Sequence, residues 1–524
     1  MGLEPEEWDL VVVGGGPGGY VAAIRAAQLG LRVAVVEQDE LGGTCLNRGC
    51  IPTKTWASAA ELAAHIRQGA EMGIRAGAEG VTVDWAALRR HQDATVSRLV
   101  KGIHFLFKKH GVTLVKGRGH LADPHIVAVA DGQSGETRNL RTTYILLATG
   151  SRPAVPRFLP YDGRYVVTSE EALRWETPPA RLVIVGGGVI GCEFASIMAD
   201  LGSQVTVVEM MPRLLPMLDE AVGREMERLF RRRGIQALTG ARVTDVRVAG
   251  PGPAGTPMGQ APAEAAAAAG APGTAGAAGV AGAAAAVPAA AVTVTVEWAG
   301  KTTPIQADCV LVSVGRQAAT AELGLTAAGV AVNSRGEIQV NERMQTSVPH
   351  IYAVGDATDC PLKLAHVASR QGIVAAHQIA HQIALQRPLK AAAATEPAPM
   401  SYRAVPSAVF TRPEAASVGQ SEAEAKAAGK AVKSSRFPFL ANGKALGMRE
   451  SEGWVNLVAE ADTGRLIGAQ IVGPHASDLL AEITLAIEKG LTAEELAGTI
   501  HAHPTLAEAI MEAAEGVSGL AIHG

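Results

Sequence analysis

Residues 9–19 read Asp-Leu-Val-Val-Val-Gly-Gly-Gly-Pro-Gly-Gly, an apolar run followed at once by closely spaced glycines. An Ala-rich segment then extends to Gly30, and residues 31–37 read Leu-Arg-Val-Ala-Val-Val-Glu. The apolar runs predict two buried strands, and the Ala-rich segment predicts the helix between them. Strand, glycine turn, helix, strand and terminal acid together form the complete dinucleotide-binding fingerprint.

The glycines of this fingerprint are Gly14, Gly16 and Gly19. They permit a tight turn, close approach of a pyrophosphate, and close packing of the helix on the strand. The helix N-terminus stabilises the phosphate charge, and we expect Glu37 to accept hydrogen bonds from a ribose. Because both strands and the acid are present, the signal is much stronger than a bare glycine pattern.

The same unit returns at residues 182–191, Leu-Val-Ile-Val-Gly-Gly-Gly-Val-Ile-Gly, and ends at Glu209. Its glycines Gly186, Gly188 and Gly191, like its acid, are offset by 172 residues from those of the first unit. Two dinucleotide sites imply two cofactors, although a duplicated fold with an inactive second site is the alternative.

The acid of the second unit indicates which nicotinamide cofactor binds. A carboxylate at Glu209 would repel a 2′-phosphate, which favours NAD over NADP. Arg213 lies four residues further on and could hold that phosphate, so NADP stays open as the alternative.

Length and composition bound the remaining possibilities. A chain of 524 residues is too long for one core and predicts three or four domains of roughly 100–150 residues. A net charge of −4 gives no reason to expect nucleic acid or an anionic membrane as a partner. The acidic N-terminus runs directly into a strand without a signal peptide, which predicts a cytoplasmic protein.

One stretch, residues 249–291, consists almost entirely of Ala, Gly and Pro, and residues 265–296 carry no charge. Ala and Gly contribute little transfer energy and the prolines break helices, so a membrane span is disfavoured. We expect a flexible surface insertion between strands of the second unit.

Residues 42–54, Gly-Gly-Thr-Cys-Leu-Asn-Arg-Gly-Cys-Ile-Pro-Thr-Lys, contain two cysteines separated by four residues. Cys45 and Cys50 are set among glycines that let the backbone approach a flat cofactor, which indicates a working disulfide. The chain has five cysteines, an odd number that does not form a disulfide scaffold. Zinc is the competing interpretation, but no second close cysteine pair follows and no histidine lies within ten residues. We interpret the other three cysteines as small apolar residues that fill the core, namely Cys192, Cys309 and Cys360.

Near the C-terminus, residues 503–508 read His-Pro-Thr-Leu-Ala-Glu. A histidine transfers protons near neutral pH, and a nearby carboxylate fixes its tautomer and raises its basicity. His503 and Glu508 lie five apart across a helix that Pro504 is expected to start, close enough for such a pair. For His501 we favour a packing role.

The Cys-Ile-Pro-Thr-Lys ending, the paired fingerprints and the His-Pro-Thr-Leu-x-Glu motif resemble the class I pyridine nucleotide-disulfide oxidoreductases, most closely those that oxidise dihydrolipoamide. The resemblance covers nearly the whole chain outside the insertion. It implies an α/β fold with two Rossmann-like dinucleotide-binding domains plus an α+β dimerisation domain, as in glutathione reductase. It also implies FAD and NAD as cofactors and a homodimer. The expected partners are the lipoyl domains of 2-oxoacid dehydrogenase or glycine cleavage complexes.

The implied domains are residues 1–152 for FAD, 153–315 for NAD with the insertion, 316–390 as the continuation of the FAD domain, and 400–524 for dimerisation.

The resemblance also implies a role for individual residues. His503 and Glu508 act with Cys45 and Cys50 of the other subunit. His503 serves as the base, Cys45 exchanges thiols with the substrate, and Cys50 lies against the flavin. Lys54 pairs with Glu193, and Asp356 meets the flavin ribityl chain. The expected cofactor-binding residues are Gly14, Gly16, Gly19, Glu37, Thr44, Lys54, Gly119, Thr149, Gly150, Ser151, Asp356, Leu364, Ala365, His366, Gly186, Gly188, Gly191, Glu193, Glu209, Val243 and Gly315, with no metal.

Two residues depart from the family pattern. Arg48 stands between the cysteines where many relatives carry Val, and Gln371 occupies a helix position where an acid is common. Either could alter substrate entry or redox potential.

Other functions remain as alternatives. A mercuric reductase would be expected to add a C-terminal cysteine pair, whereas this chain ends Gly-Leu-Ala-Ile-His-Gly. A glutathione reductase should carry arginines after the second fingerprint, where Met210 and Met211 stand. A purely structural subunit of a multienzyme complex has no positive support in the sequence.

Overall fold

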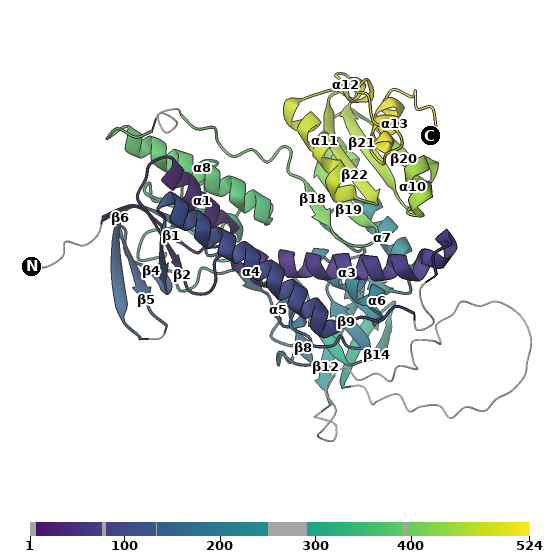
Figure 1. Cartoon of the computed structure of the whole chain (residues 1–524), viewed down its shortest axis with the longest axis horizontal. Helices are drawn as coiled ribbons and strands as arrows, with labels where there is room; N and C mark the ends of the chain where they lie inside the picture. Colours follow the sequence, from purple (N-terminus) through teal and green to yellow (C-terminus); the bar gives the residue numbers. More distant parts are fainter. Residues whose placement is uncertain (1–6, 76–79, 133, 250–290, 391–395, 524) are drawn as a thin grey trace, which may run out of the picture.

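The computed structural model describes residues 7–75, 80–132, 134–249, 291–390 and 396–523 (Figure 1). The predicted insertion at 249–291 therefore lies almost entirely outside the described residues. Within the described part, no helix is both long enough and apolar enough to cross a membrane.

The N-terminal unit is a seven-stranded sheet in which β3, β2, β1 and β6 follow one another in parallel, and β5 and β4 continue antiparallel. β17 returns to this sheet late in the chain and pairs in parallel with β6, as the sequence predicts for a first unit that is interrupted and resumed. The strands are β1 Glu7–Val13, β2 Val33–Glu37, β3 Thr113–Lys116, β4 Arg118–Asp123, β5 Ile126–Ala130, β6 Thr137–Leu147 and β17 Ile351–Ala353.

Two helices from distant parts of the chain, α1 (Pro17–Gln28) and α8 (Ala365–Ala384), lie side by side on this sheet (Figure 1). Small residues make the close contact possible. A Cβ at Gly372 in α8 would lie 2.4 Å from the carbonyl oxygen of Gly18 in α1, so only glycine fits there. The long helix α4 (Trp85–His110) packs beside them and continues toward α3 (Cys50–Gln68).

The second unit is a five-stranded, fully parallel sheet in the order β11-β10-β9-β15-β8. Helix α6 (Val189–Asp200) follows its glycine turn, and the short α5 (Ser169–Ala172) and α7 (Glu220–Arg232) complete the unit. Its strands are β8 Val166–Val167, β9 Arg181–Val185, β10 Gln204–Glu209, β11 Gln236–Thr239 and β15 Cys309–Val312. A separate antiparallel sheet contains β12 Arg242–Val248, β13 Val292–Trp298 and β14 Lys301–Ala307, and the Ala/Gly/Pro segment joins β12 to β13.

The glycine turns of the two units have the same geometry. Gly14 and Gly186 have φ values of +106° and +109°, which an L side chain rarely adopts. A Cβ at Gly19 would lie 1.9 Å from the carbonyl oxygen of Gly14, and a Cβ at Gly191 would lie 1.9 Å from that of Gly186. Both fingerprints are therefore built to bring a helix N-terminus against the preceding strand.

The C-terminal unit is an antiparallel sheet in the order β18-β19-β22-β21-β20 (Figure 1). Its strands are β18 Ser407–Val409, β19 Glu414–Gly419, β20 Val432–Pro438, β21 Trp454–Glu460 and β22 Leu466–Gly473. Its helices are α9 Glu422–Ala427, α10 Gly443–Met448, α11 Ala476–Lys489, α12 Ala493–Ala497 and α13 Glu508–Val517. Helices α11 and α13 pack on the sheet around an apolar core that includes Ile471, Ile483 and Ile510.

The helix expected to start at Pro504 begins instead at Glu508. The carboxylate of Glu508 accepts a hydrogen bond at 2.8 Å from the backbone N–H of Thr505. Residues 504–507 therefore form a non-helical entry that the first residue of the helix holds in place.

Helix α3 ties the units together, because it runs between the second unit and the C-terminal unit (Figure 1). Its Trp56 is fully buried in the core of the second unit and packs edge-on against Trp85, with ring centroids 5.4 Å apart. Cys50, the first residue of this helix, is thus anchored to more than one domain.

Candidate active site

The two cysteines lie at the junction of α2 (Gly43–Arg48) and α3. Cys45 is inside α2, and Cys50 is the first residue of α3. This junction rests on the first dinucleotide turn, because a Cβ at Gly43 would lie 2.8 Å from the Cα atom of Gly16. Gly42 and Gly43 have φ values of +97° and +58°, so the approach depends on glycine. A group bound at the first turn would therefore lie beside the cysteines.

No disulfide joins Cys45 to Cys50 in this structure. A hydrogen bond from the Cys45 thiol lowers the pKa of Cys50 to about 7, against the effect of burial and with the help of the Lys54 charge. The same hydrogen bond, together with burial, raises the pKa of Cys45. Cys50 is therefore the thiolate of the pair near neutral pH and Cys45 is the thiol that donates to it. The disulfide form stays a prediction.

Lys54 lies one turn of α3 beyond Cys50 and forms an ion pair with Glu193 of α6. Its Nζ atom is 2.9 Å from Oε1 and 2.7 Å from Oε2 of that carboxylate, whose side chain is 5% exposed. The backbone N–H of Phe410, in the C-terminal unit, donates to Oε1 at 3.0 Å, and Lys54 Nζ lies 4.5 Å from the centre of the Phe410 ring. The sequence-predicted pair is thus present, and it joins all three units.

Asp356 lies in a short 3₁₀ turn, η3 (Gly355–Ala357), directly after β17. The hydroxyl of Ser151 donates to Asp356 Oδ2 at 2.6 Å, and Arg316 Nε donates to the same hydroxyl at 2.7 Å. The Asp356 charge also raises the pKa of Cys45, after the effects of Cys50 and burial. The structure therefore brings Asp356 and Ser151 together near the cysteine pair.

Helix α8 starts at Ala365, with Leu364 as its N-cap. His366 Nε2 lies 2.8 Å from the carbonyl oxygen of Pro406, which links the start of α8 to the segment that enters the C-terminal unit.

The first unit fits an adenine dinucleotide such as FAD. Glu37 accepts hydrogen bonds from the backbone N–H groups of Gly15 at 2.7 Å and Asp39 at 2.8 Å, which fixes its carboxylate at the turn. The Thr149 hydroxyl is buried and has no hydrogen-bond partner among the described residues, so it has capacity for a bound polar group.

The second unit repeats this arrangement. Glu209 accepts hydrogen bonds from the N–H groups of Gly187 at 2.5 Å and Met211 at 2.7 Å. Arg213, the residue that kept NADP open, donates to the carbonyl oxygens of Pro216 at 3.1 Å and Leu218 at 3.4 Å. Its guanidinium is thus engaged within its own loop, which agrees with NAD.

The remaining predicted cofactor residues lie on several other elements. Gly150 and Gly315 have φ values of +67° and +128° and precede the paired strands β7 (Ser151–Pro153) and β16 (Arg316–Ala318). Thr44 precedes Cys45 in α2. Gly119 on β4 and the buried Val243 on β12 pack against neighbouring strands, so only their backbones are available to a ligand.

His503 and Glu508 form the predicted pair, with 2.8 Å between His503 Nδ1 and Glu508 Oε1. The hydrogen bond from the Thr505 N–H lowers the pKa of Glu508, and His503 adds to this effect. The His503 side chain is 80% exposed, and among the described residues no hydrogen bond or ion pair joins it to either cysteine. One chain alone therefore does not connect the base to the thiols.

His501 is placed differently from His503. Its side chain is 5% exposed, and its Nδ1 atom lies 2.8 Å from the carbonyl oxygen of Thr499. Its Nε2 atom is 3.2 Å from Glu482 Oε1, close enough for an ion pair but without hydrogen-bond geometry. A packing role agrees with this burial.

Arg48, which departs from the family pattern between the two cysteines, forms ion pairs. Its Nη1 atom lies 2.5 Å from Asp39 Oδ2, and its Nε atom lies 3.7 Å from Glu170 in the second unit. Arg48 therefore connects the end of α2 to the loop after β2 and to α5.

Sequence reasoning missed a cavity of about 500 Å³ beside the cysteines. The apolar spacing of Leu99, Ile103 and Leu106 along α4 was the signal that could have indicated it. The cavity is lined by Tyr20, Leu46, Ile51, Arg98, Leu99, Gly102, Ile103 and Leu106. Leu46 and Ile51 directly follow the two cysteines in the chain, and Cys45 packs against the same apolar cluster as these two residues.

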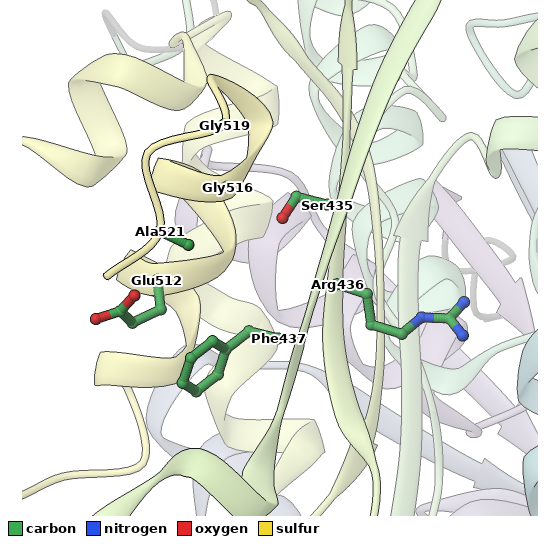
Figure 2. A pocket seen from close by; sticks show the side chains of 7 residues that line it. All are labelled: Ser435, Arg436, Phe437, Glu512, Gly516, Gly519 and Ala521. Carbon is green, nitrogen blue, oxygen red and sulfur yellow. The ribbon is translucent and has the colours of Figure 1, made fainter. Parts of the chain in front are cut away.

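A second cavity of about 260 Å³ lies between β20 and α13 and contains none of the predicted site residues (Figure 2). Glu512 on its wall is buried and accepts hydrogen bonds from the backbone N–H groups of Ile522 and His523. Glu512 therefore holds the last segment of the chain against α13.

The chain matches two families: pyridine nucleotide-disulphide oxidoreductase over residues 8–260 and 276–372, and the dimerisation domain of these proteins over residues 405–514.

Among curated proteins, it is 40% identical over 524 residues to a dihydrolipoyl dehydrogenase of Bacillus subtilis, covering 99% of each chain. It is 39% identical to one of Geobacillus stearothermophilus, covering 99% of this chain and 97% of the relative.

Among solved structures, LpdA of Mycobacterium tuberculosis matches with a TM-score of 0.80 and 26% identity, covering 97% of this chain and 99% of that one. A HOCl-induced flavoprotein disulfide reductase of Escherichia coli, RclA, shares the fold with a TM-score of 0.76 and 23% identity, covering the same shares.

Proposed function

Because the chain belongs to the pyridine nucleotide-disulphide oxidoreductase family, we propose that it oxidises dihydrolipoamide to lipoamide and reduces NAD⁺ to NADH, with FAD between them. Relatives named dihydrolipoyl dehydrogenase that match at about 40% identity over the full length support this substrate. The observation that carries the proposal is the Cys45–Cys50 pair, which rests on the first dinucleotide turn with Cys50 as its thiolate.

The first step is a thiol–disulfide exchange. With Cys45 and Cys50 joined as a disulfide, His503 takes a proton from one thiol of dihydrolipoamide, and the resulting thiolate attacks the sulfur of Cys45. The bond between Cys45 and Cys50 breaks, and Cys50 leaves as a thiolate. The low pKa of Cys50 makes it the better leaving group.

The second substrate thiol then attacks the mixed disulfide, closes the lipoamide ring and releases Cys45 as a thiolate, which takes up a proton. Two electrons and two protons have left the substrate, and both electrons now reside on the cysteine pair. In the resulting pair, the Cys45 thiol donates a hydrogen bond to the Cys50 thiolate.

A bound FAD would supply an acceptor for this electron pair and a hydride donor to NAD⁺. Glu37 and Thr149 would hold the FAD, and Glu209 would hold the NAD⁺ ribose. The Lys54–Glu193 pair lies between the cysteines and the second glycine turn, so it would order the space between the two cofactors.

Glu508 is hydrogen-bonded to the Nδ1 atom of His503 and so fixes the imidazole ring. This leaves Nε2 of His503 as the atom that takes the proton. Because His503 is exposed and unconnected to the cysteines of its own chain, we assign it to the active site of the partner subunit. The match to the dimerisation domain supports a homodimer.

Two finer assignments belong to the proposal. The partners are the lipoyl domains of 2-oxoacid dehydrogenase or glycine cleavage complexes, for which this chain would serve as the E3 component. The location is the cytoplasm, which cell fractionation would test.

The test is an assay of the purified, FAD-loaded dimer with dihydrolipoamide and NAD⁺. We expect NADH formation, and no turnover by a yellow dimer would overturn the proposal. Glutathione disulfide and Hg²⁺, each supplied with NADPH, are the control substrates. Faster turnover of either one would indicate another reductase of the same family.

A further inference from the structure

Gln371, in the second turn of α8, is a polar side chain with no exposed surface. Its Oε1 atom accepts a hydrogen bond from the backbone N–H of Gly355 at 2.7 Å. Its Nε2 atom donates to the hydroxyl oxygen of Tyr402 at 2.8 Å. The amide therefore joins the turn that follows β17 to the segment that leads into the C-terminal unit.

The turn held by Gln371 is the one that presents Asp356. Gly355 has a φ of +71°, and the Thr358 hydroxyl donates to its carbonyl oxygen at 2.8 Å. Its N–H is buried, and an unpaired buried N–H costs about 1–3 kcal/mol. Gln371 supplies the acceptor that this N–H needs, and so fixes the residue before Asp356.

Gln371 performs this task without a charge. The charged groups around the turn already form pairs: Asp356 with Ser151 and Arg316, and Lys363 with Glu337. Asp359 Oδ1 accepts from the N–H of Val340 at 3.3 Å. A carboxylate in place of the Gln371 amide would add a buried negative charge beside the turn and near the N-terminus of α8.

We propose that Gln371 is a positioning residue that holds the Gly355–Asp356 turn with an uncharged side chain and thereby keeps the bound flavin easier to reduce. The reasoning rests on the proposed function in one respect, namely that Asp356 and the start of α8 face FAD. Negative charge develops on the flavin when it is reduced, so a nearby carboxylate would disfavour the reduced state.

Gln371→Glu tests the charge and leaves the shape unchanged. The carboxylate keeps an acceptor for the Gly355 N–H, and the Tyr402 hydroxyl can rotate to donate to it, so both hydrogen bonds survive. Burial raises the pKa of such a carboxylate, to about 8–9 in documented cases, so the variant must be compared with the parent from about pH 6 to about pH 10.

The measurement is the midpoint potential of bound FAD, obtained by reductive titration with dithionite and a reference dye without either substrate. At the alkaline end we expect Gln371→Glu to have a more negative potential than the parent. The expected size is a roughly tenfold lower ratio of reduced to oxidised flavin at a fixed potential, equivalent to about 1.4 kcal/mol. The two curves should converge at the acidic end, where the carboxyl group is protonated.

Two further variants separate charge from geometry. Tyr402→Phe keeps the neutral amide and the Gly355 bond, so its potential should follow the parent at every pH. Gln371→Leu removes the acceptor, and we expect its apoprotein to bind FAD about tenfold more weakly, within the range for an unsatisfied buried N–H.

Superimposed potentials of parent and Gln371→Glu across the whole pH range would overturn the inference, as would unchanged FAD affinity in Gln371→Leu. Should Gln371→Glu fail to fold, the FAD affinity of Gln371→Leu still decides whether Gln371 positions the turn. Failure of the proposed function gives a different result, namely a parent that binds FAD and titrates normally but does not oxidise dihydrolipoamide.

Discussion

Replacement of Lys54 by Met should raise the pKa of the Cys50 thiol. The Lys54 charge is one of the causes that lower this pKa to about 7, and Glu193 acts in the opposite direction. With its Nζ atom held between both Glu193 oxygens at 2.7–2.9 Å, Lys54 is fixed close to the cysteine rather than free in solvent. A nearby opposite charge commonly shifts a pKa by about 1–3 units, and we expect a rise of about one unit, equivalent to about 1.4 kcal/mol, on loss of the Lys54 charge.

The rise in the pKa of Cys50 lowers the fraction of this residue that is thiolate at neutral pH. At pH 7 a Cys50 with a pKa of about 7 is about half thiolate, and a rise of about one unit leaves roughly a tenth. Glu193→Gln should shift the pKa the other way, because it removes a charge that raises it. Lys54→Arg, which keeps the charge, is the matched control and should move the pKa least.

The assay is the pH dependence of iodoacetamide alkylation of the reduced protein in a Cys45→Ser background, so that only Cys50 of the pair reports. The buried thiols Cys192, Cys309 and Cys360 are quantified separately by peptide mapping. Shifts in the same direction for Lys54→Met and Glu193→Gln, or no shift in either, would refute the reasoning.

Three further predictions follow from the same geometry. His503→Gln should lower turnover with dihydrolipoamide by about 10²–10⁴-fold, while the thiol titration of Cys50 stays unchanged. Near-full turnover in this variant would refute the assignment of His503 as the base. In Gly191→Ala the new Cβ would lie 1.9 Å from the Gly186 carbonyl oxygen. This variant should still bind FAD and be reduced by dihydrolipoamide, but it should form no NADH. Normal NADH formation would show that the second turn tolerates the methyl group. Arg48→Val removes partly exposed ion pairs with Asp39 and Glu170. It should lower the free energy of unfolding, measured by denaturant titration, by only about 0–1 kcal/mol. A larger loss of stability would reveal a structural role.

The sequence predicted the parts of the fold whose information is local and repeated. Both glycine turns, their flanking strands and the acids Glu37 and Glu209 follow from one pattern that occurs twice, and the structure gives both the same hydrogen bonds. The pairing of β17 with β6 agrees with the continuation of the FAD domain that the family resemblance implies for residues 316–390.

Contacts between distant segments could not be predicted in the same way. The role of Arg48 depends on Glu170, which the second unit supplies, and the role of Gln371 depends on Tyr402 in the linker segment. The start of α13 at Glu508 rather than Pro504 depends on a side chain that reaches back to Thr505. The separation of Cys45 and Cys50 into thiol and thiolate depends first on the hydrogen bond between them and then on burial and nearby charges, which spacing alone does not give.

The central claim is that Cys50 faces the flavin and Cys45 faces the substrate. Stopped-flow reduction of the FAD-loaded protein with dihydrolipoamide, followed at the long-wavelength thiolate-to-flavin absorbance, tests it directly in wild type and in two reduced variants. We predict that wild type develops this absorbance, that Cys45→Ser shows it without added substrate above pH 7, and that Cys50→Ser lacks it at every pH. Absorbance that persists in Cys50→Ser and disappears in Cys45→Ser would contradict the assignment.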